Sequence, residues 1–446
     1  MKFSVKHILS ATMIAIAGMS VSAQTLNSLY FLDGNTQRHL LNPAMTCESG
    51  WLSLPFFGGF GVSINSNLGL EAFLRPYGNN EMITFLHPDV STEDALSKFK
   101  DMNTIETDID LNVLTVGFKA FGGVNSIGVS VKSRTGMYLP KDIFTFLKAG
   151  QESYVTEYNI DNMSARSMNY AEVALGHSRD INSKLRIGAK LKVLVGGAYA
   201  NADVEQMRIY MSADKWMIQQ KSTFTASKGI NLITKSNGEI DDFDYEFNIG
   251  GYGVGVDLGA VYKVMNNLKV SLAVTDLGFI NWKDATTHNN MHDSFEYNGF
   301  DNIAHEDSQV FEDAAEDVAD RLEELVRYQK DGSKTSHSSQ LHTTFRAGAE
   351  YGVLNNKITF GLLGTMRTGA PKAYNEAMLS VNFKPGKYFN AAINGSTSTT
   401  HTSVGGVICL GNFFIGADYA LAKYSKQVIP VDAAKFNVSF GTSIKF

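Results

Sequence analysis

Three basic residues, Arg186, Lys190 and Lys192, have the types and the spacing that could bind an acidic group. They lie in the stretch LRIGAKLKVLV, residues 185–195, in which apolar and polar residues alternate with period two. Alternate side chains of a β-strand point to the same face, so the three cations are predicted to share one face. Guanidinium and ammonium groups bind carboxylates, and we expect this face to contact an acidic ligand.

Motifs that would support catalysis are missing from the sequence. There is no G-x-S-x-G, H-E-x-x-H, Walker A or C-x-x-C motif. The glycines of 250–259 lack dinucleotide-binding spacing and alternate with strand residues, which favours a strand with a glycine-rich inner face. His288, His292 and Asp293 could ligate a metal on a helix, but they lie in an asparagine-rich stretch without helical periodicity. The sequence therefore predicts no enzyme, no catalytic residue, no cofactor and no metal site.

The first residues predict export. Lys2 and Lys6 precede an apolar stretch at 8–18, and small residues end this pattern at Ala23. Such a pattern is typical of a secretory signal peptide, here 1–23, cleaved after Ala23. The apolar stretch is too short to span a bilayer, and no run of 18 apolar residues follows it.

Alternation of apolar and polar residues continues through most of the chain. A soluble β-sandwich and a membrane β-barrel would both produce it. The strands are about ten residues long, which suits a tilted membrane strand. Their polar faces combine glycine with scattered Lys and Arg, as a crowded lumen would require. These features favour an all-β transmembrane antiparallel barrel. The alternating runs are 185–195, 252–264, 268–278, 340–351, 357–366, 373–383, 388–397 and 436–446.

Connection lengths also alternate along the chain. Outer-membrane barrels have short periplasmic turns and long extracellular loops, so the short side is predicted to be periplasmic. The wall is predicted to have fourteen strands, or sixteen if the 203–225 hairpin also crosses the membrane. Short connections are expected at 121–123, 180–184, 265–267, 354–356, 384–387 and 411–412, and long ones at 66–104, 134–169, 226–250, 279–339 and 421–435.

In a barrel, the face that carries the three cations lines the lumen. Asp257 and Glu350 are the main acidic residues expected there, and the N-terminal stretch 24–50 adds only Asp33 and Glu48. We therefore predict spare positive charge in the lumen, where Arg186, Lys190 and Lys192 help to hold an acidic amphiphile. The other cations predicted on this face are Lys132, Lys263, Lys269, Arg346, Lys357 and Lys445.

Three features together resemble the long-chain fatty-acid channel (FadL-like) superfamily. They are the signal peptide, the motif Asn42-Pro43-Ala44 before the first strand, and the C-terminal Phe446. In that superfamily an N-terminal hatch carrying an Asn-Pro-Ala motif sits inside a fourteen-stranded barrel. The resemblance implies a hatch at 24–50, with Phe446 as the signal for the barrel assembly machinery.

A second resemblance runs the length of the chain. The stretches at 139–150, 177–196 and 275–282 look like a Bacteroidetes outer-membrane family of uncharacterised activity. This resemblance implies a barrel at 51–446, but it implies no particular activity. The FadL-like superfamily also includes barrels of type IX secretion, which anchor or shuttle a partner protein.

Two segments outside the predicted wall could form helices. Apolar residues recur at helical spacing from 310 to 325 within the acidic loop 281–340, as in a solvated amphipathic helix or a docking helix. A short helix is expected after Pro140 and should end at Gly150. Its apolar residues 143–147 could receive a hydrophobic ligand or pack against a neighbouring loop.

Two functional hypotheses follow for an exported barrel. One is a channel for hydrophobic or amphipathic small molecules, and the other is a non-transporting barrel that anchors a partner. The expected partners are outer-membrane lipid and lipopolysaccharide, the assembly machinery and a hydrophobic small molecule, with no nucleic acid. Cys47 and Cys409 could form one disulfide or remain free thiols.

Overall fold

The computed structural model describes most of the predicted barrel. Of the predicted signal peptide, only Lys2 and Phe3 are described, and the stretch 310–325 lies outside the described residues. The described ranges are 2–3, 27–53, 58–77, 81–150, 155–212, 216–228, 230–234, 240–245, 248–291, 295–297, 334–368, 373–386, 388–420 and 434–446.

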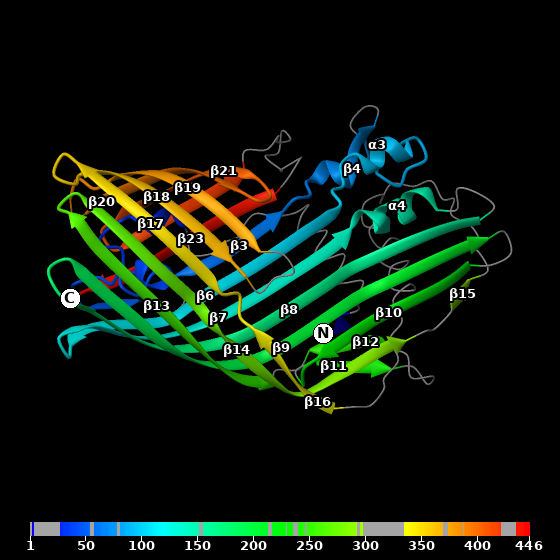
Figure 1. Cartoon of the computed structure of the whole chain (residues 1–446), viewed down its shortest axis with the longest axis horizontal. Helices are drawn as coiled ribbons and strands as arrows, with labels where there is room; N and C mark the ends of the chain where they lie inside the picture. The colour runs from blue at the N-terminus through cyan, green and yellow to red at the C-terminus, as the bar shows by residue number, and fades with distance from the viewer. Residues whose placement is uncertain are drawn as a thin grey trace.

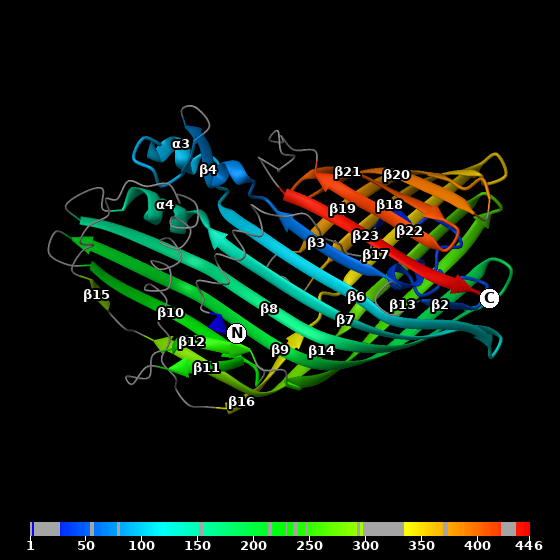
Figure 2. The ribbon, with the colours of Figure 1, turned by 180° about the vertical axis from the view of Figure 1, so that it is seen from behind.

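The described strands close into an antiparallel barrel of fourteen wall positions (Figure 1), which confirms the predicted all-β antiparallel barrel. The first position is shared by β2 (Trp51–Ser53) and β3 (Phe60–Ser66), since both pair with the last strand and with β6. Figure 2 shows β3 beside β23, where the wall closes. The remaining wall strands are β6 (Met102–Ala120), β7 (Gly123–Pro140), β8 (Val155–Asp180), β9 (Leu185–Ser212), β13 (Gly251–Met265), β14 (Leu268–Met291), β17 (Thr344–Val353), β18 (Ile358–Arg367), β19 (Tyr374–Phe383), β20 (Phe389–Ser398), β21 (Thr402–Leu410), β22 (Phe413–Ala420) and β23 (Ala434–Lys445).

The 203–225 hairpin extends the wall rather than adding two strands to it. β10 (Trp216–Ala226) pairs with the far half of β9 and with the far end of β14, beyond the point where β9 pairs with β13. β15 (Phe295–Tyr297) pairs with β10, and β16 (Lys334–Gln340) pairs with β14, so both strands lengthen the same side of the wall. A small separate sheet contains β11 (Ile230–Thr234), β12 (Ile240–Tyr245) and β1 (Lys2–Phe3).

All six predicted short connections lie at the end of the barrel that carries the C-terminus (Figure 1), which we call the turn end. The opposite end is called the loop end. The predicted long connection 134–169 is wrong in extent, because β7 continues to Pro140 and β8 begins at Val155. β14 likewise continues to Met291, into the predicted loop 279–339. These stretches are rich in polar residues and lack the apolar outer face of the other strands. The alternation of apolar and polar residues that predicts a strand is therefore absent there.

Side chains of the wall alternate between the two faces as the sequence predicts. On β9, Leu191 is 65% exposed on the outside, whereas Lys190 and Lys192 on either side of it are buried. Large apolar side chains cover the outer face of other wall strands, including Leu272 and Leu379. None of the described helices is long and apolar enough to cross a membrane.

The loop end contains an apolar cluster. It joins the 66–104 connection, with β4 (Leu74–Tyr77), β5 (Glu81–Thr84) and α3 (Thr92–Leu96), to α4 (Lys141–Ala149) and to the far halves of β8 and β9. Figure 1 shows α4 between α3 and the extended end of β8. We call this the loop-end cluster.

The predicted helix after Pro140 is confirmed as α4, which ends at Gly150 with φ 58°. Its apolar residues Ile143, Phe144 and Phe146 are buried in the loop-end cluster. The Phe144 ring stacks on Phe99 with the ring centroids 4.0 Å apart. These three residues therefore pack against neighbouring loops, as one of the two alternatives predicted. They do not form an exposed surface that could receive a hydrophobic ligand.

Candidate functional site: the N-terminal segment and its seat in the barrel

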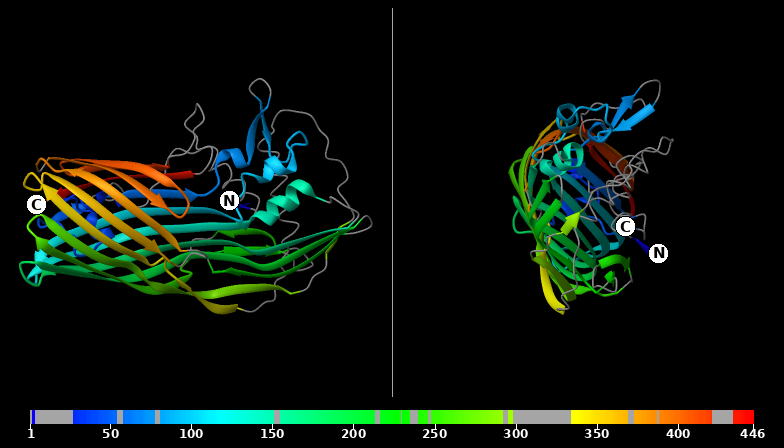
Figure 3. Two further views of the ribbon diagram at one scale, coloured as in Figure 1. Left: turned by 45° about the horizontal axis from the view of Figure 1, so that its top comes forward. Right: turned by 90° about the vertical axis from the view of Figure 1, so that its right-hand side faces the viewer.

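Residues 27–49 lie inside the turn end of the barrel, and we call them the N-terminal segment (Figure 3). The segment contains a 3-10 turn, η1 (Asn27–Leu29), and one turn of α-helix, α2 (Arg38–Leu41). Most of its side chains are buried, and they contact inward-facing residues of the wall.

The Asn-Pro-Ala motif forms a compact turn within this segment. The Asn42 side-chain oxygen accepts a hydrogen bond from the Ala44 amide at 3.0 Å, which is the capping role expected of an asparagine before a turn. The Asn42 amide donates to the Tyr30 hydroxyl at 3.1 Å and to the Leu272 carbonyl of β14 at 3.2 Å. Asn42 thus ties the turn both to the segment and to the wall.

Two glycines of the wall make room for this turn. Gly188 of β9 and Gly259 of β13 are paired across neighbouring strands. A Cβ on Gly259 would overlap the Asn42 side-chain oxygen and lie 2.9 Å from Pro43 Cδ, and one on Gly188 would overlap the Pro43 carbonyl. We call the pair the glycine notch. The notch accounts for Gly259 only, since a Cβ on Gly251, Gly253 or Gly255 would instead meet other wall residues.

An aromatic pair fixes the beginning of the segment against β17 and β18, which follow β14 around the wall. The Tyr30 ring lies over Gly348 of β17, and Phe31 fills the space beside Gly361 of β18. Tyr30 and Phe31 pack with Leu363 and other inward apolar residues of the wall. We call this contact the aromatic anchor, because burial of two aromatic side chains dominates its energetics.

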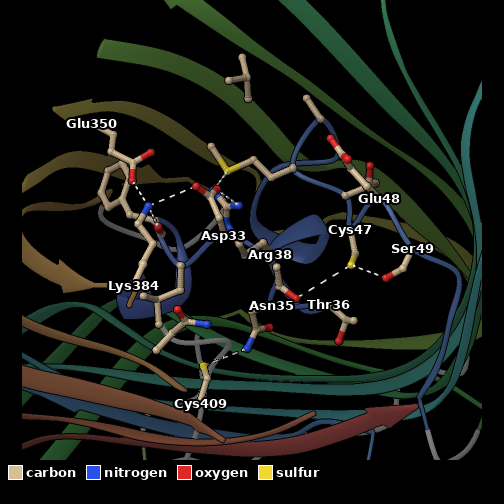
Figure 4. Close-up of a pocket in the computed structure, with 18 of the residues that line it drawn as sticks. Asp33, Asn35, Thr36, Arg38, Cys47, Glu48, Ser49, Glu350, Lys384 and Cys409 are labelled. Carbon is tan, nitrogen blue, oxygen red and sulfur yellow. Dashed lines mark hydrogen bonds and ion pairs between the residues drawn. The ribbon is translucent and has the colours of Figure 1, made fainter. Parts of the chain in front are cut away.

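Ion pairs hold the segment at the mouth of the turn end (Figure 4). Asp33 contacts Arg38 at 2.5 Å, and it contacts Lys269 and Lys384 of the wall at 3.2 Å each. Lys384 also contacts Glu350 at 2.6 Å. Desolvation raises the pKa of Asp33, but the three neighbouring cations outweigh it and hold this pKa well below its usual range. We call these residues the turn-end ion cluster.

A cavity of about 1050 Å³ lies between the segment and the wall at the turn end (Figure 4). Cys47 of the segment and Cys409 of β21 both line it, and both are buried free thiols, so the disulfide alternative is not formed. The Asn35 side-chain amide donates to Cys409 Sγ at 3.4 Å. The lining is mixed, with apolar Phe31 and Leu32 beside several cations.

The three predicted ligand contacts all face the interior, but they do not converge on one cavity. Arg186 lines the turn-end cavity, where it donates to Thr46 Oγ1 at 2.8 Å. Lys190 and Lys192 lie deeper and line a separate cavity of about 100 Å³. The Lys192 ammonium contacts Asp257 at 2.7 Å, so its charge is already paired. Their roles in ligand binding stay predictions.

The predicted surplus of positive charge in the lumen is smaller than expected, because acidic residues that sequence reasoning missed pair with several of the cations. Glu172 and Asp276 pair with Lys132 and Lys192, and Asp108 and Asp110 pair with cations of β7 and β18. The alternation places Glu172 and Asp276 inward only once the extents and bulges of β8 and β14 are known. Asp276 has φ 58° within β14, a departure that period-two reasoning cannot anticipate.

The chain terminus lies at the turn end. The Phe446 side chain is 72% exposed, and its backbone amide donates to the Gly50 carbonyl at 2.9 Å. The last residue therefore closes against the start of the wall. Its role as an assembly signal stays a prediction.

Comparison with known proteins identifies the family. A family model described as a family of unknown function, DUF5723, matches residues 43–418. The chain belongs to this family. No curated protein matches the sequence.

Solved structures similar to this DUF5723 chain are remote. The TodX deltaS2S3 mutant monoaromatic hydrocarbon channel is 10% identical, with TM-score 0.42, covering 96% of this chain and 97% of that chain. The Pseudomonas putida toluene transporter TodX is 10% identical, with TM-score 0.39 and coverage of 96% and 95%. A Pseudomonas aeruginosa FadL homologue is 10% identical, with TM-score 0.40 and coverage of 95% and 98%. At these values the likeness supports no functional argument.

Proposed function

We propose that this protein is an outer-membrane channel for hydrophobic or amphipathic small molecules, in which the N-terminal segment is a displaceable hatch. The proposal rests on the observation that the lumen contains the chain's own N-terminal segment. The turn end of the barrel is filled by the chain's own segment 27–49, beside a cavity of about 1050 Å³. A separate chain segment that fills the lumen can move out and open a path for a small molecule. A lumen filled by side chains of the wall itself has no such movable part.

The mixed lining of the turn-end cavity supports an amphipathic cargo. Apolar residues such as Leu32 and Val261 could contact an alkyl or aryl body. Arg186 and Lys445 line the same cavity and could contact an acidic head. The apolar outer face of the wall supports residence in a membrane.

The location and the origin belong to the same proposal. Cleavage after Ala23 would deliver the chain to the periplasm, and Phe446 would direct assembly into the outer membrane with the turn end periplasmic. A Bacteroidetes origin is what the sequence resemblance implies. We favour a channel over a barrel that only anchors a partner, because an anchor has no use for a seated, separable segment.

Uptake by cells tests the proposal. Cells carrying the protein in their outer membrane would be given a fluorescent medium-chain carboxylate, and in parallel an uncharged dye of similar length. We expect uptake of at least one probe to exceed that of cells without the protein. Gly259→Leu should change this uptake by displacing the Asn-Pro-Ala turn, whereas Gly395→Leu, with no atom near its would-be Cβ, should not. Uptake independent of the protein for both probes would refute a channel.

A further inference from the structure

A second, smaller cavity lies deeper in the barrel than the turn-end cavity. It measures about 100 Å³ and is lined by Gln37 and His39 of the N-terminal segment together with charged residues of the wall. We call it the inner cavity. Its size leaves room for a few water molecules or a small ion, and it is far too small for an amphiphile.

Most charged groups around the inner cavity are paired. The Lys192 ammonium contacts Asp257 and Asp276 at 2.7 Å each, and the Lys132 ammonium contacts Glu172 at 3.0 Å. Around the same cavity, Arg134 contacts Asp110 and Arg367 contacts Asp108, both at 2.5 Å. These ion pairs engage every carboxylate that lines the inner cavity among the described residues, although Glu172 Oε2 itself accepts no hydrogen bond.

Lys190 is the exception. Its side chain is only 4% exposed and lines the inner cavity, yet it makes no hydrogen bond or ion pair with any part of the chain that the structure describes. Asp257 lies opposite Lys190 in the β9–β13 register. However, the Asp257 Oδ1 atom is occupied by the Lys192 ammonium at 2.7 Å and by the Asp276 amide at 2.7 Å.

Arg346 of β17 is a second cation that forms no ion pair within the described part of the chain, although it lines a further small cavity together with Glu376. Its guanidinium is buried and lines the same cavity. It donates to the Asn27 side-chain oxygen at 3.4 Å and to Thr275 Oγ1 at 3.1 Å, and both acceptors are neutral. Among the described residues it has no ion pair within 4.0 Å.

The inner cavity is therefore surrounded by more cations than carboxylates. A buried cation without a counter-charge is costly, because burial removes part of its hydration and no carboxylate compensates for the loss. An anion in the cavity would supply the missing partner. The cations lining it or bound to its lining are Lys132, Arg134, Lys190, Lys192, Arg346 and Arg367, and they outnumber the carboxylates Asp108, Asp110, Glu172, Asp257 and Asp276.

We propose that the inner cavity binds a small inorganic anion of halide size, held by Lys190 with Arg346 contributing from β17. The anion completes the charge balance of the lumen without entering the transport path. Because Gln37 and His39 line the same cavity, the bound anion also stabilises the docked N-terminal segment. The site is independent of the cargo, and it would exist in a barrel that transports nothing.

Bromide is the probe that tests this site. Crystals of the full-length protein soaked in sodium bromide should show an anomalous peak in the inner cavity, within about 3.5 Å of the Lys190 ammonium. In detergent, bromide should raise the thermal midpoint by about 2–4 °C relative to the same concentration of gluconate, which the cavity is too small to admit. Lys190→Met should abolish both effects.

Lys263→Met is the matched control, since Lys263 belongs to β13 but is exposed near the turn end. It should keep the bromide peak and the midpoint shift. No peak in the wild-type cavity would overturn the proposal, as would an undiminished peak in Lys190→Met. Peaks confined to surface lysines would show an adventitious ion only and would also overturn it. The wild-type soak tests the proposal even if Lys190→Met does not fold.

Discussion

The two ends of the barrel are filled in different ways. At the loop end, the loop-end cluster brings together aromatic and aliphatic side chains, with Phe144 stacked on Phe99. At the turn end, the N-terminal segment is held by the aromatic anchor and by buried aliphatic side chains such as Leu29, Leu32 and Leu41. It is also held by polar contacts, namely the turn in the glycine notch and the turn-end ion cluster.

This difference indicates which end can respond to its surroundings. Apolar burial is not screened by salt and does not depend on the protonation of side chains, so the loop-end cluster should behave as fixed structure at moderate salt and pH. Ion pairs weaken with salt, and buried titratable groups respond to pH. The glycine notch has no side chains that would hold the Asn-Pro-Ala turn in place, so the turn can leave it. The turn end is therefore the end where a gate would be expected.

The largest effect is expected from breaking the loop-end cluster. Phe144→Ala removes a buried aromatic ring and should destabilise the cluster by about 3–5 kcal/mol. We expect faster proteolytic cleavage within 66–104, with the barrel still folded in detergent gels. Phe121→Ala, at an exposed turn residue, is the control and should leave cleavage unchanged. An equal rate in Phe144→Ala would show that the cluster does not fix the loop end.

Filling the glycine notch should have the next largest effect. Gly188→Val places a side chain against the Pro43 backbone, which cannot move aside by a rotamer change, at a cost of about 1–3 kcal/mol. The segment should undock more often, and maleimide should label buried Cys47 faster in a Cys409→Ser background. Gly395→Val is the matched control. Unchanged labelling in Gly188→Val would mean that the notch does not seat the segment.

Acid should loosen the segment through His39. Burial lowers the pKa of His39 well below its usual range, and the nearby cations Lys190 and Lys192 lower it further. Its neutral form therefore stabilises docking above about pH 6.5, and this contribution is lost as the pH falls below that value. Cys47 labelling, divided by the labelling rate of the denatured protein at the same pH, should rise between about pH 6.5 and 5, and His39→Gln should flatten this dependence. Asp33 stays ionised in this window, because its pKa is lowered.

The smallest effect is expected at the turn-end ion cluster. Asp33 is 47% exposed, so its ion pairs are screened by solvent and Asp33→Asn should cost no more than about 1 kcal/mol. The change in Cys47 labelling should be largest at low salt and should fade near 1 M salt. An effect that does not depend on salt would assign Asp33 a role other than ion pairing.

The sequence was sufficient to predict the barrel and the helix after Pro140, because each depends on a local pattern. It left the strand count open between fourteen and sixteen, because the 203–225 hairpin alternates in the same way whether or not it crosses the membrane. Period-two alternation placed Lys190 and Lys192 inward, as the structure shows. The glycine notch could not be predicted, since Gly188 and Gly259 meet only through the β9–β13 register. The pairing of Lys192 with Asp276 likewise depends on a bulge and on positive φ, and neither leaves a periodic signal.

Locking the N-terminal segment to the wall tests the central claim most directly. Thr46 Oγ1 and Ser178 Oγ of β8 are 2.6 Å apart, close enough for cysteines at both positions to form a disulfide. Uptake of the fluorescent carboxylate would be measured for Thr46→Cys/Ser178→Cys, in a Cys47→Ser/Cys409→Ser background, before and after reduction. A hatch predicts that uptake stops in the oxidised protein and returns on reduction. Equal uptake in the two states, with the disulfide verified, would contradict it.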